Sequence, residues 1–441
     1  MIRSLILAFA LVATFTLGLG SKAEAAVWTE VNQWSPTWEA RFAEWVRSSW
    51  QVDFFSRPVL PNGQSNPYAG LRLDCADTVY SMRLIFAYEN RLPFVIQDPT
   101  ASGKTLSNKM SRWDGQSETS RVRNFLVFMF QTVSTRSLPN DTYPVAVNRD
   151  AIHSGSLILT VAKNHHSWTI KEILSIGVPH LVYNSTVGAS SGSGLQQRQS
   201  WPNPEWVFEE NFTAAGNAGF RYWRPTEYLN QPVWKTPGYS EEQYKIPLGK
   251  WVRTVQSKLA LRQETDTQMM TRMLNTTCED LTGRVTAVND GLNYLKKNPK
   301  CMDYATYDTY STPNRDQRAF DDFVALRRAY REILAANGGN QLSAEMKAQL
   351  GKIYPMIQSS IAAETQNMAP QGITSASLCT TEYLPGKRMD VAEFKRRLSA
   401  GLISNNPHDE GSYRWGDLRG PSQRAKSCQS WDSWTPDLNQ N

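Results

Sequence analysis

Cys75 stands at the start of a predicted helix, where a thiol has chemistry open to it. Asp74 is a good N-cap residue, and Asp77 can reach back as the second half of a capping box. Free backbone N–H groups and the positive end of the helix dipole favour a thiolate there, although the two carboxylates oppose it. Cys75 is therefore a candidate nucleophile, and the alternative is a small buried residue beside ordinary capping residues.

The distribution of the five cysteines supports the same choice independently. Cys75 is alone in the N-terminal half, and the others share the C-terminal half: Cys278, Cys301, Cys379 and Cys428. In an oxidising compartment an even set pairs, which leaves Cys75 free. A continuous helix from Cys278 to Lys297 would separate its ends by about 30 Å, which argues against a Cys278–Cys301 bridge. Each of those two is therefore expected to pair with Cys379 or Cys428, in an order that stays open.

The first 25 residues predict a cleavable secretory signal. Arg3 opens a charged region, Leu5 to Leu19 are apolar, and Ala23-Glu24-Ala25 is a small-residue cleavage site, so the mature chain is expected to begin at Ala26. The residue directly after the cleavage site is not a cysteine, and no later apolar run reaches the ~18 residues that a transmembrane helix needs. We expect a periplasmic or secreted protein without a lipid anchor or membrane span.

The composition narrows the possible partners. Hydrophobic residues make up 40% of the chain, which supplies a sizeable core and excludes global disorder. A formal charge of +6 allows an anionic polymer as partner without showing one. No phosphate-binding loop, nucleic-acid motif or repeat is evident, so no nucleic acid is expected. No cofactor is expected either, because His165 and His166 face opposite sides of a strand and no third metal ligand is suitably spaced.

A nucleophilic thiol needs a general base, and His166 is the favoured one of five histidines. It opens the predicted strand 166–173, which a turn joins to a hairpin partner at 180–185. His166 then lies opposite Asn184 or Ser185, and Asn184 could orient its ring. His165 points the other way, and a slip of one residue would exchange the two histidines.

These residues resemble the NlpC/P60 group of papain-like cysteine peptidases over roughly residues 60 to 190. The resemblance rests on Asp74-Cys75-Ala76-Asp77 opening a helix, a histidine opening a later strand and a polar residue on the next strand. It implies an envelope enzyme that cuts peptidoglycan stem peptides, with Tyr68 matching a substrate-binding tyrosine. Asp74, Asp77 and Trp168, which shares the face of His166, complete the candidate substrate-binding set. Ala76-Asp77 departs from the Ser-Gly of that group.

A second resemblance and the domain division complete the expectations from the sequence. His166-Ser167-Trp168 is similar to the His-Ala-Trp of transglutaminase-like proteins. Residues 26–245 are expected to form an α+β papain-like domain with a helix packed on an antiparallel sheet. Residues 246–441 are expected to form a mainly helical domain held by disulfides. The Gly- and Ser-rich stretch 187–199 is read as either a mobile flap or a surface connection.

The predicted function is an exported cysteine hydrolase that cleaves a peptide or amide bond, with peptidoglycan or another envelope peptide polymer as its partner. Cys75 would attack the carbonyl, His166 would take and return the proton, and Asn184 would hold His166. The thiol pKa is expected to fall below the ~8.5 of a free cysteine. Two alternatives stay open: transfer of the acyl group to an amine or hydroxyl, and a non-catalytic envelope-binding protein that keeps a relic of the site.

Overall fold

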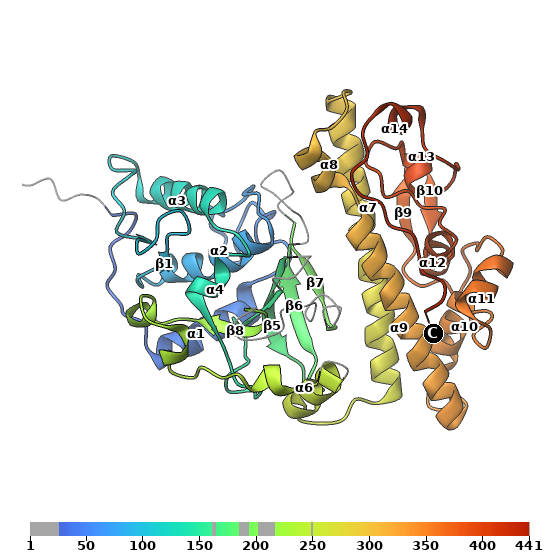
Figure 1. Cartoon of the computed structure of the whole chain (residues 1–441), viewed down its shortest axis with the longest axis horizontal. Coiled ribbons are helices and arrows are strands. Elements are labelled where there is room, and N and C mark those ends of the chain that lie inside the picture. The colour runs from blue at the N-terminus through green and yellow to red at the C-terminus, as the bar shows by residue number, and fades with distance from the viewer. Residues whose placement is uncertain (1–25, 161–164, 185–193, 202–216, 248–249, 441) are drawn as a thin grey trace, which may run out of the picture.

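The computed structural model describes residues 26–160, 165–184, 194–201, 217–247 and 250–440. The predicted signal peptide lies outside these residues, as does the part of the predicted flap from 187 to 193. The described residues build two large hydrophobic cores, one within Val27 to Leu259 and one within Met270 to Trp415, and a small third cluster of Leu295, Met302 and Tyr307. Figure 1 shows them as a sheet-containing half and a helical half, with α7 (Asp266–Lys297) between the sheet and the other helices.

The division between the halves lies later than the predicted boundary at 245/246. Helix α6 (Trp251–Leu259) buries Trp251, Val255 and Leu259 in the first core, so it belongs to the sheet-containing half. The turn at Gly177 packs directly on this helix, since a Cβ on Gly177 would collide with the backbone of Gln256. The halves therefore divide between α6 and α7.

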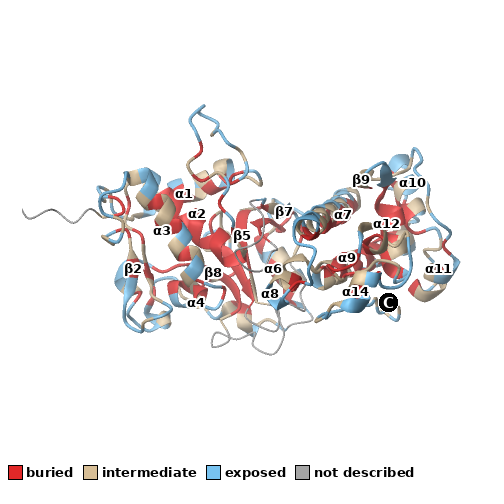
Figure 2. Ribbon diagram, turned by 90° about the horizontal axis from the view of Figure 1, so that it is seen from above, coloured by how far each residue is buried: buried red, intermediate tan, exposed pale blue. Residues whose placement is uncertain are grey.

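Besides α6, four α-helices in the described residues of the first half pack around its sheet. They are α1 (Pro36–Ser49), α2 (Cys75–Glu89), α3 (Glu118–Thr132) and α4 (Leu138–Asp141). Helix α1 begins at Pro36, where Ser35 caps it and proline fits the first helical position. Helix α2 is buried along nearly its whole length, from Cys75 to Ala87, and occupies the centre of this half (Figure 2).

The main sheet has six antiparallel strands in the order β3-β8-β4-β5-β6-β7. Their bounds are β3 (Thr142–Pro144), β4 (Leu157–Thr160), β5 (His166–Ile173), β6 (Pro179–Tyr183), β7 (Gln196–Arg198) and β8 (Gly219–Trp223). A separate pair joins β1 (Val95–Gln97) to β2 (Thr105–Ser107). The predicted α+β class with an antiparallel sheet is confirmed. Residues 196–198, assigned to the flap, instead form an edge strand.

The helical half is built around two long helices, α7 and α9 (Pro313–Asn337). The others are α8 (Tyr304–Tyr310), α10 (Ala344–Ile353), α11 (Ile361–Asn367), α12 (Val391–Ser399), α13 (Gly411–Arg414) and α14 (Gln423–Ser427). A hairpin of β9 (Thr381–Leu384) and β10 (Lys387–Met389) joins them. Helix α10 ends at Ile353 because Pro355 restricts the backbone of Tyr354, and α11 starts separately after it.

Two disulfides tie the tail of the chain to this half. They join Cys278 to Cys379 and Cys301 to Cys428, and Cys75 is free. The predictions that Cys75 alone is unpaired and that Cys278 and Cys301 each bond a tail cysteine are therefore confirmed. None of the helices in the described ranges combines the length and apolar character that crossing a membrane requires.

An ion pair joins the two halves. Arg198 of β7 donates to Asp322 of α9 at 2.6 Å, and the Arg198 side chain is buried. Helix α7 lies alongside the same strand. The helical half therefore packs against the β7 edge of the sheet.

Candidate active site at the start of helix α2

The start of α2 has the capping geometry that the sequence predicts. The Asp77 backbone N–H donates to Asp74 Oδ1 at 2.9 Å, and the Asp74 N–H donates to Asp77 Oδ2 at 2.9 Å. This reciprocal capping box fixes Cys75 at the first helical position. Both carboxylates are therefore engaged with the helix start, which leaves the predicted substrate-binding roles of Asp74 and Asp77 without structural support.

Two neighbouring strands hold the helix start against the sheet. Ser167 Oγ donates to the Cys75 carbonyl at 2.9 Å, and Asn184 Nδ2 donates to the Leu73 carbonyl at 2.7 Å. Thr169 pairs with Val182 across β5 and β6, so Ser167 and Asn184 lie opposite each other on the same face. The residue facing α2 from β5 is thus Ser167, and Asn184 positions the chain just before Cys75.

His166 nevertheless approaches the thiol by folding back over its own strand. The Ser167 backbone N–H donates to His166 Nδ1 at 2.8 Å, and this same N–H lies against Cys75 Sγ, where it lowers the thiol pKa. Because Nδ1 accepts this bond, the proton of a neutral His166 is on Nε2 and the basic nitrogen is on the side of the thiol. Cys75 and His166 therefore converge on one peptide group.

The surroundings of His166 keep its ring neutral. The ring packs on Trp168 with 4.3 Å between centroids and lies 5.9 Å from Tyr183. Burial lowers the pKa of His166 to about 3, and the positive charges of Arg318 and Arg315 on α9 add to the effect. The helical half thus acts electrostatically on the histidine. Trp168 is buried and supports this ring, so it is not a free surface for substrate.

His165 reaches the same site by another route. Arg136 donates to His165 Nε2 from Nη2 at 3.0 Å and from Nε at 3.2 Å. The preceding residue, Thr135, is hydrogen-bonded to Cys75 Sγ through its hydroxyl at 3.2 Å. Since the guanidinium occupies Nε2, His165 would have to release Arg136 before this nitrogen could accept a proton. His166 Nδ1 likewise accepts a bond from the Ser167 N–H, but this N–H is the one that also contacts the thiol, and this shared contact favours His166 as the base.

Comparisons of the chain with protein-family models, curated proteins and solved structures gave no match.

The Cys75 thiol is not activated in this conformation, so the predicted low pKa is wrong here. Burial raises its pKa to about 12, and the negative charge of Asp74 adds to the rise. Hydrogen bonds from Thr135 and Ser167 oppose the shift without cancelling it. Burial and the charge of Asp74 also raise the pKa of Asp77 to about 8. The loss of hydration therefore raises the pKa of the Cys75 thiol more than the helix start lowers it.

Tyr68 lies away from the site, contrary to its predicted role. It is buried, stacks on Phe54, and donates through its hydroxyl to Glu89 Oε1 at 3.1 Å. Glu89 is the last residue of α2, about 21 Å from Cys75 by helical rise. Tyr68 therefore anchors the far end of the helix and is a core residue.

Sequence reasoning did not identify Thr135, Arg136 or Ser167 as site residues. Thr135 and Arg136 follow α3 in an irregular stretch, and no periodic pattern connects them to Cys75. Ser167 had a usable signal, because strand alternation places it on the face opposite to that of Trp168. Within the described part of the chain, no group of three or more His, Cys, Asp or Glu side chains is arranged to hold a metal ion.

Proposed function

We propose that this chain is an exported cysteine hydrolase that cleaves a peptide or amide bond in cell-wall peptidoglycan, with Cys75 as its nucleophile. One observation carries the proposal: the single unpaired cysteine opens a capped helix, beside an amide that it shares with the basic nitrogen of His166. A helix start, a histidine on one strand and a polar residue on the next are the parts that acyl transfer through a thiol requires.

Each group has a defined task in this proposal. Once it is released from the Ser167 N–H, His166 Nδ1 takes the thiol proton as Sγ attacks the substrate carbonyl, and backbone N–H groups at the start of α2 stabilise the oxyanion. His166 then gives the proton to the leaving amine, which leaves an acyl group on Cys75. Water, deprotonated by His166, releases the acid and restores the thiol. Asn184 acts on the helix start through the Leu73 carbonyl.

The buried thiol implies that substrate must open the site. Cys75 is 9% exposed and Thr135 covers it with a hydrogen bond. Displacement of the segment carrying Thr135 would remove this cover and reduce the desolvation that raises the thiol pKa. Two disulfides in the helical half agree with export to a periplasmic or extracellular location.

A second candidate is a non-catalytic envelope-binding protein with a relic of this site. The thiol pKa of about 12 and the burial of Cys75 favour it. Such a protein would bind peptidoglycan without changing it, and Cys75→Ala would leave binding intact. Transfer of the acyl group to an amine or hydroxyl uses the same first step and differs only in the acceptor.

Digestion of purified peptidoglycan by the mature protein tests these possibilities. Wild type should release peptides with new carboxyl and amino ends, identified by mass, and Cys75→Ala should release none while unfolding at a similar temperature. Addition of an amine acceptor should give no adduct if hydrolysis is the reaction. Identical, unchanged peptidoglycan in both samples would overturn the hydrolase and favour the binding protein.

A further inference from the structure

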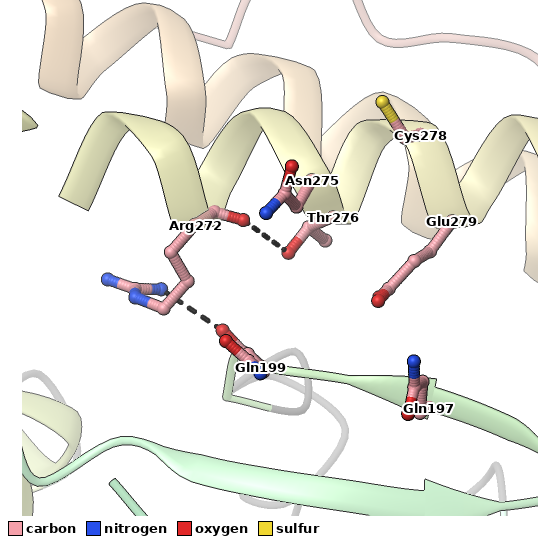
Figure 3. A pocket seen from close by; sticks show the side chains of 7 residues that line it. All are labelled: Gln197, Gln199, Arg272, Asn275, Thr276, Cys278 and Glu279. Carbon is pink, nitrogen blue, oxygen red and sulfur yellow. Dashed lines mark hydrogen bonds between the residues drawn. The ribbon is translucent and has the colours of Figure 1, made fainter. Parts of the chain in front are cut away.

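A polar cavity of about 300 Å³ lies where the two halves meet, and none of the candidate active-site residues lines it. Strand β7 and helix α7 line it through Gln197, Gln199, Arg272, Asn275, Thr276, Cys278 and Glu279. In Figure 3 the Glu279 side chain extends from α7 toward the strand that carries Gln197. The cavity therefore has one carboxyl group and one guanidinium group set among amides and a hydroxyl.

Glu279 has no dedicated partner in this cavity. Its Oε2 atom is buried and makes no hydrogen bond within the described residues. Burial raises the pKa of Glu279 to about 8; Arg198 opposes the rise, and the nearby acids Asp280 and Asp322 add to it. A carboxyl group in such a position gains most from a ligand that brings positive charge.

The neighbouring cations are already engaged with other acids. Arg272 pairs with Glu264 through two contacts of 2.9 Å. Arg198 donates to Asp322 at 2.6 Å. Arg318 donates to Asp280 at 3.4 Å. Arg272, Arg198 and Arg318 are thus each paired with an acid other than Glu279.

The other lining groups suit a ligand that carries amides. Asn275 and two glutamines, Gln197 of β7 and Gln199 just after this strand, each offer one acceptor and two donors. Gln197 Oε1 lies 3.3 Å from His180 Nε2, and Thr276 Oγ1 donates to the Arg272 carbonyl at 3.2 Å. These contacts leave the amide NH₂ group of Gln197 for a ligand carbonyl.

We propose that this cavity binds a small polar ligand through a primary ammonium group, which Glu279 receives while the amides of β7 and α7 bond its peptide groups. The carrier that fits is the free side-chain amine of a diamino acid in a peptidoglycan stem peptide. This choice of carrier rests on the proposed function, whereas the ammonium site rests on the cavity and Glu279.

Calorimetric titration of the full mature chain carrying Cys75→Ala tests the site without turnover. Three probes are compared: a soluble stem peptide with a free side-chain amine, the same peptide acetylated on that amine, and a linear polyamine. The free-amine peptide should bind at least tenfold more tightly than the acetylated one. Equal binding of these two peptides would overturn the proposal, and binding of the polyamine alone would keep the ammonium site and overturn the carrier.

The matched variants are Glu279→Gln and, as control, Glu345→Gln on the exposed surface of α10. Glu279→Gln should weaken binding of the free amine at least tenfold and keep the unfolding temperature, since glutamine has the shape of a protonated glutamate. The control should bind as the parent does. Unchanged affinity in Glu279→Gln would overturn the role of this carboxyl.

Proton release provides a readout that separates this site from catalysis. An ammonium group arriving beside a protonated Glu279 should expel its proton, so titrations at pH 7 in two buffers of different ionisation enthalpy should differ. The affinity should rise from pH 6 to pH 8. If the free-amine peptide binds with these properties but wild type leaves peptidoglycan uncut, the ammonium site stands and the proposed hydrolase is overturned. If wild type digests peptidoglycan but the peptide does not bind, the hydrolase stands and the ammonium site is overturned.

Discussion

The Ser167 hydroxyl lies 2.9 Å from the Cys75 carbonyl oxygen and joins strand β5 to the first turn of helix α2. Both residues are buried. Asn184, which directly follows the neighbouring strand β6 and lies opposite Ser167, donates in the same way to the Leu73 carbonyl. The position of the thiol is thus set by two polar bonds from adjacent strands as well as by the caps of its own helix.

Ser167→Ala should lower the free energy of unfolding by about 1 kcal/mol, because it removes a buried hydrogen bond and leaves the Cys75 carbonyl oxygen without this donor. Urea unfolding followed by fluorescence measures this difference. Ser427→Ala at the exposed end of α14 is the matched control and should change stability by less than about 0.5 kcal/mol. Equal effects would show that the Ser167 bond does not hold the helix.

Alkylation of Cys75 by iodoacetamide in the native protein should be at least about 100-fold slower at pH 7 than in denaturant, because the thiol is buried and largely protonated. Its rate should climb through pH 10 without a plateau, as the thiol pKa of about 12 requires. Asp74→Asn should lower that pKa, since it removes a nearby negative charge and keeps a good N-cap. A plateau near pH 6 in wild type would contradict the closed, protonated site.

Stability should fall as pH rises from 6.5 to 8. The pKa of Asp77 is raised to about 8 and that of Asp141 to about 7, in both cases chiefly by burial, so the folded state holds protons that the unfolded state has released. The low pKa of His166 acts only below about 6.5 and does not enter this window.

Asp77→Asn should make that slope shallower by at most about 1.4 kcal/mol per pH unit, the contribution of one proton. Asp98→Asn is the control, because hydrogen bonding to Thr100 lowers the pKa of Asp98 and moves its titration below the window. Urea midpoints at half-unit steps of pH give the slopes. Parallel curves for Asp77→Asn and wild type would contradict a protonated Asp77.

If the proposed hydrolysis holds, His166→Ala should reduce kcat by at least about 100-fold, the scale of a lost general base. His165→Ala should cost less than about tenfold, because Arg136 occupies its Nε2. Peptidoglycan digestion with saturating substrate measures both. The reverse order of effects would make His165 the base and would place Arg136 among the groups that move on substrate binding.

Removal of the Cys278–Cys379 bridge by a double serine substitution should cost about 2–4 kcal/mol of stability. The Cys301–Cys428 bridge is the natural comparison, since the sequence separations of 101 and 127 residues predict similar loop-closure effects. Denaturant unfolding under oxidising conditions measures both. A cost near zero for the first pair alone would mean that the contacts of α7 already hold Cys278 in place.

The sequence predicted those parts of the fold whose signals are local. The capping box at Asp74 and the strand over residues 166–173 each depend on neighbouring residues, and each is present. The grouping of the cysteines along the chain predicted that Cys75 is free and that Cys278 and Cys301 each bond a tail cysteine, but not which one. The strand β7 was missed because its residues, Gln196 to Arg198, become strand only through pairing with β6.

The candidate site was predicted in part for the same reason. Cys75 was identifiable from its cap, whereas Thr135 contacts it across 60 residues of sequence. Tyr68 was expected beside Cys75 because the two are seven residues apart in sequence. This separation does not show in which direction the chain runs beside α2, and Tyr68 lies at the far end of the helix. The thiol pKa was misjudged because burial depends on the whole first core, which no local pattern records.

The contact of α7 and α9 with β7 has a consequence for the integrity of the sheet. An uncovered edge strand offers unpaired backbone groups to any other strand and is a starting point for aggregation. Helix α7 lies along this edge, and Asp322 neutralises the inward Arg198. The helical half therefore protects this edge of the sheet, and a chain that ended after α6 would expose β7 and leave Arg198 without its counterion.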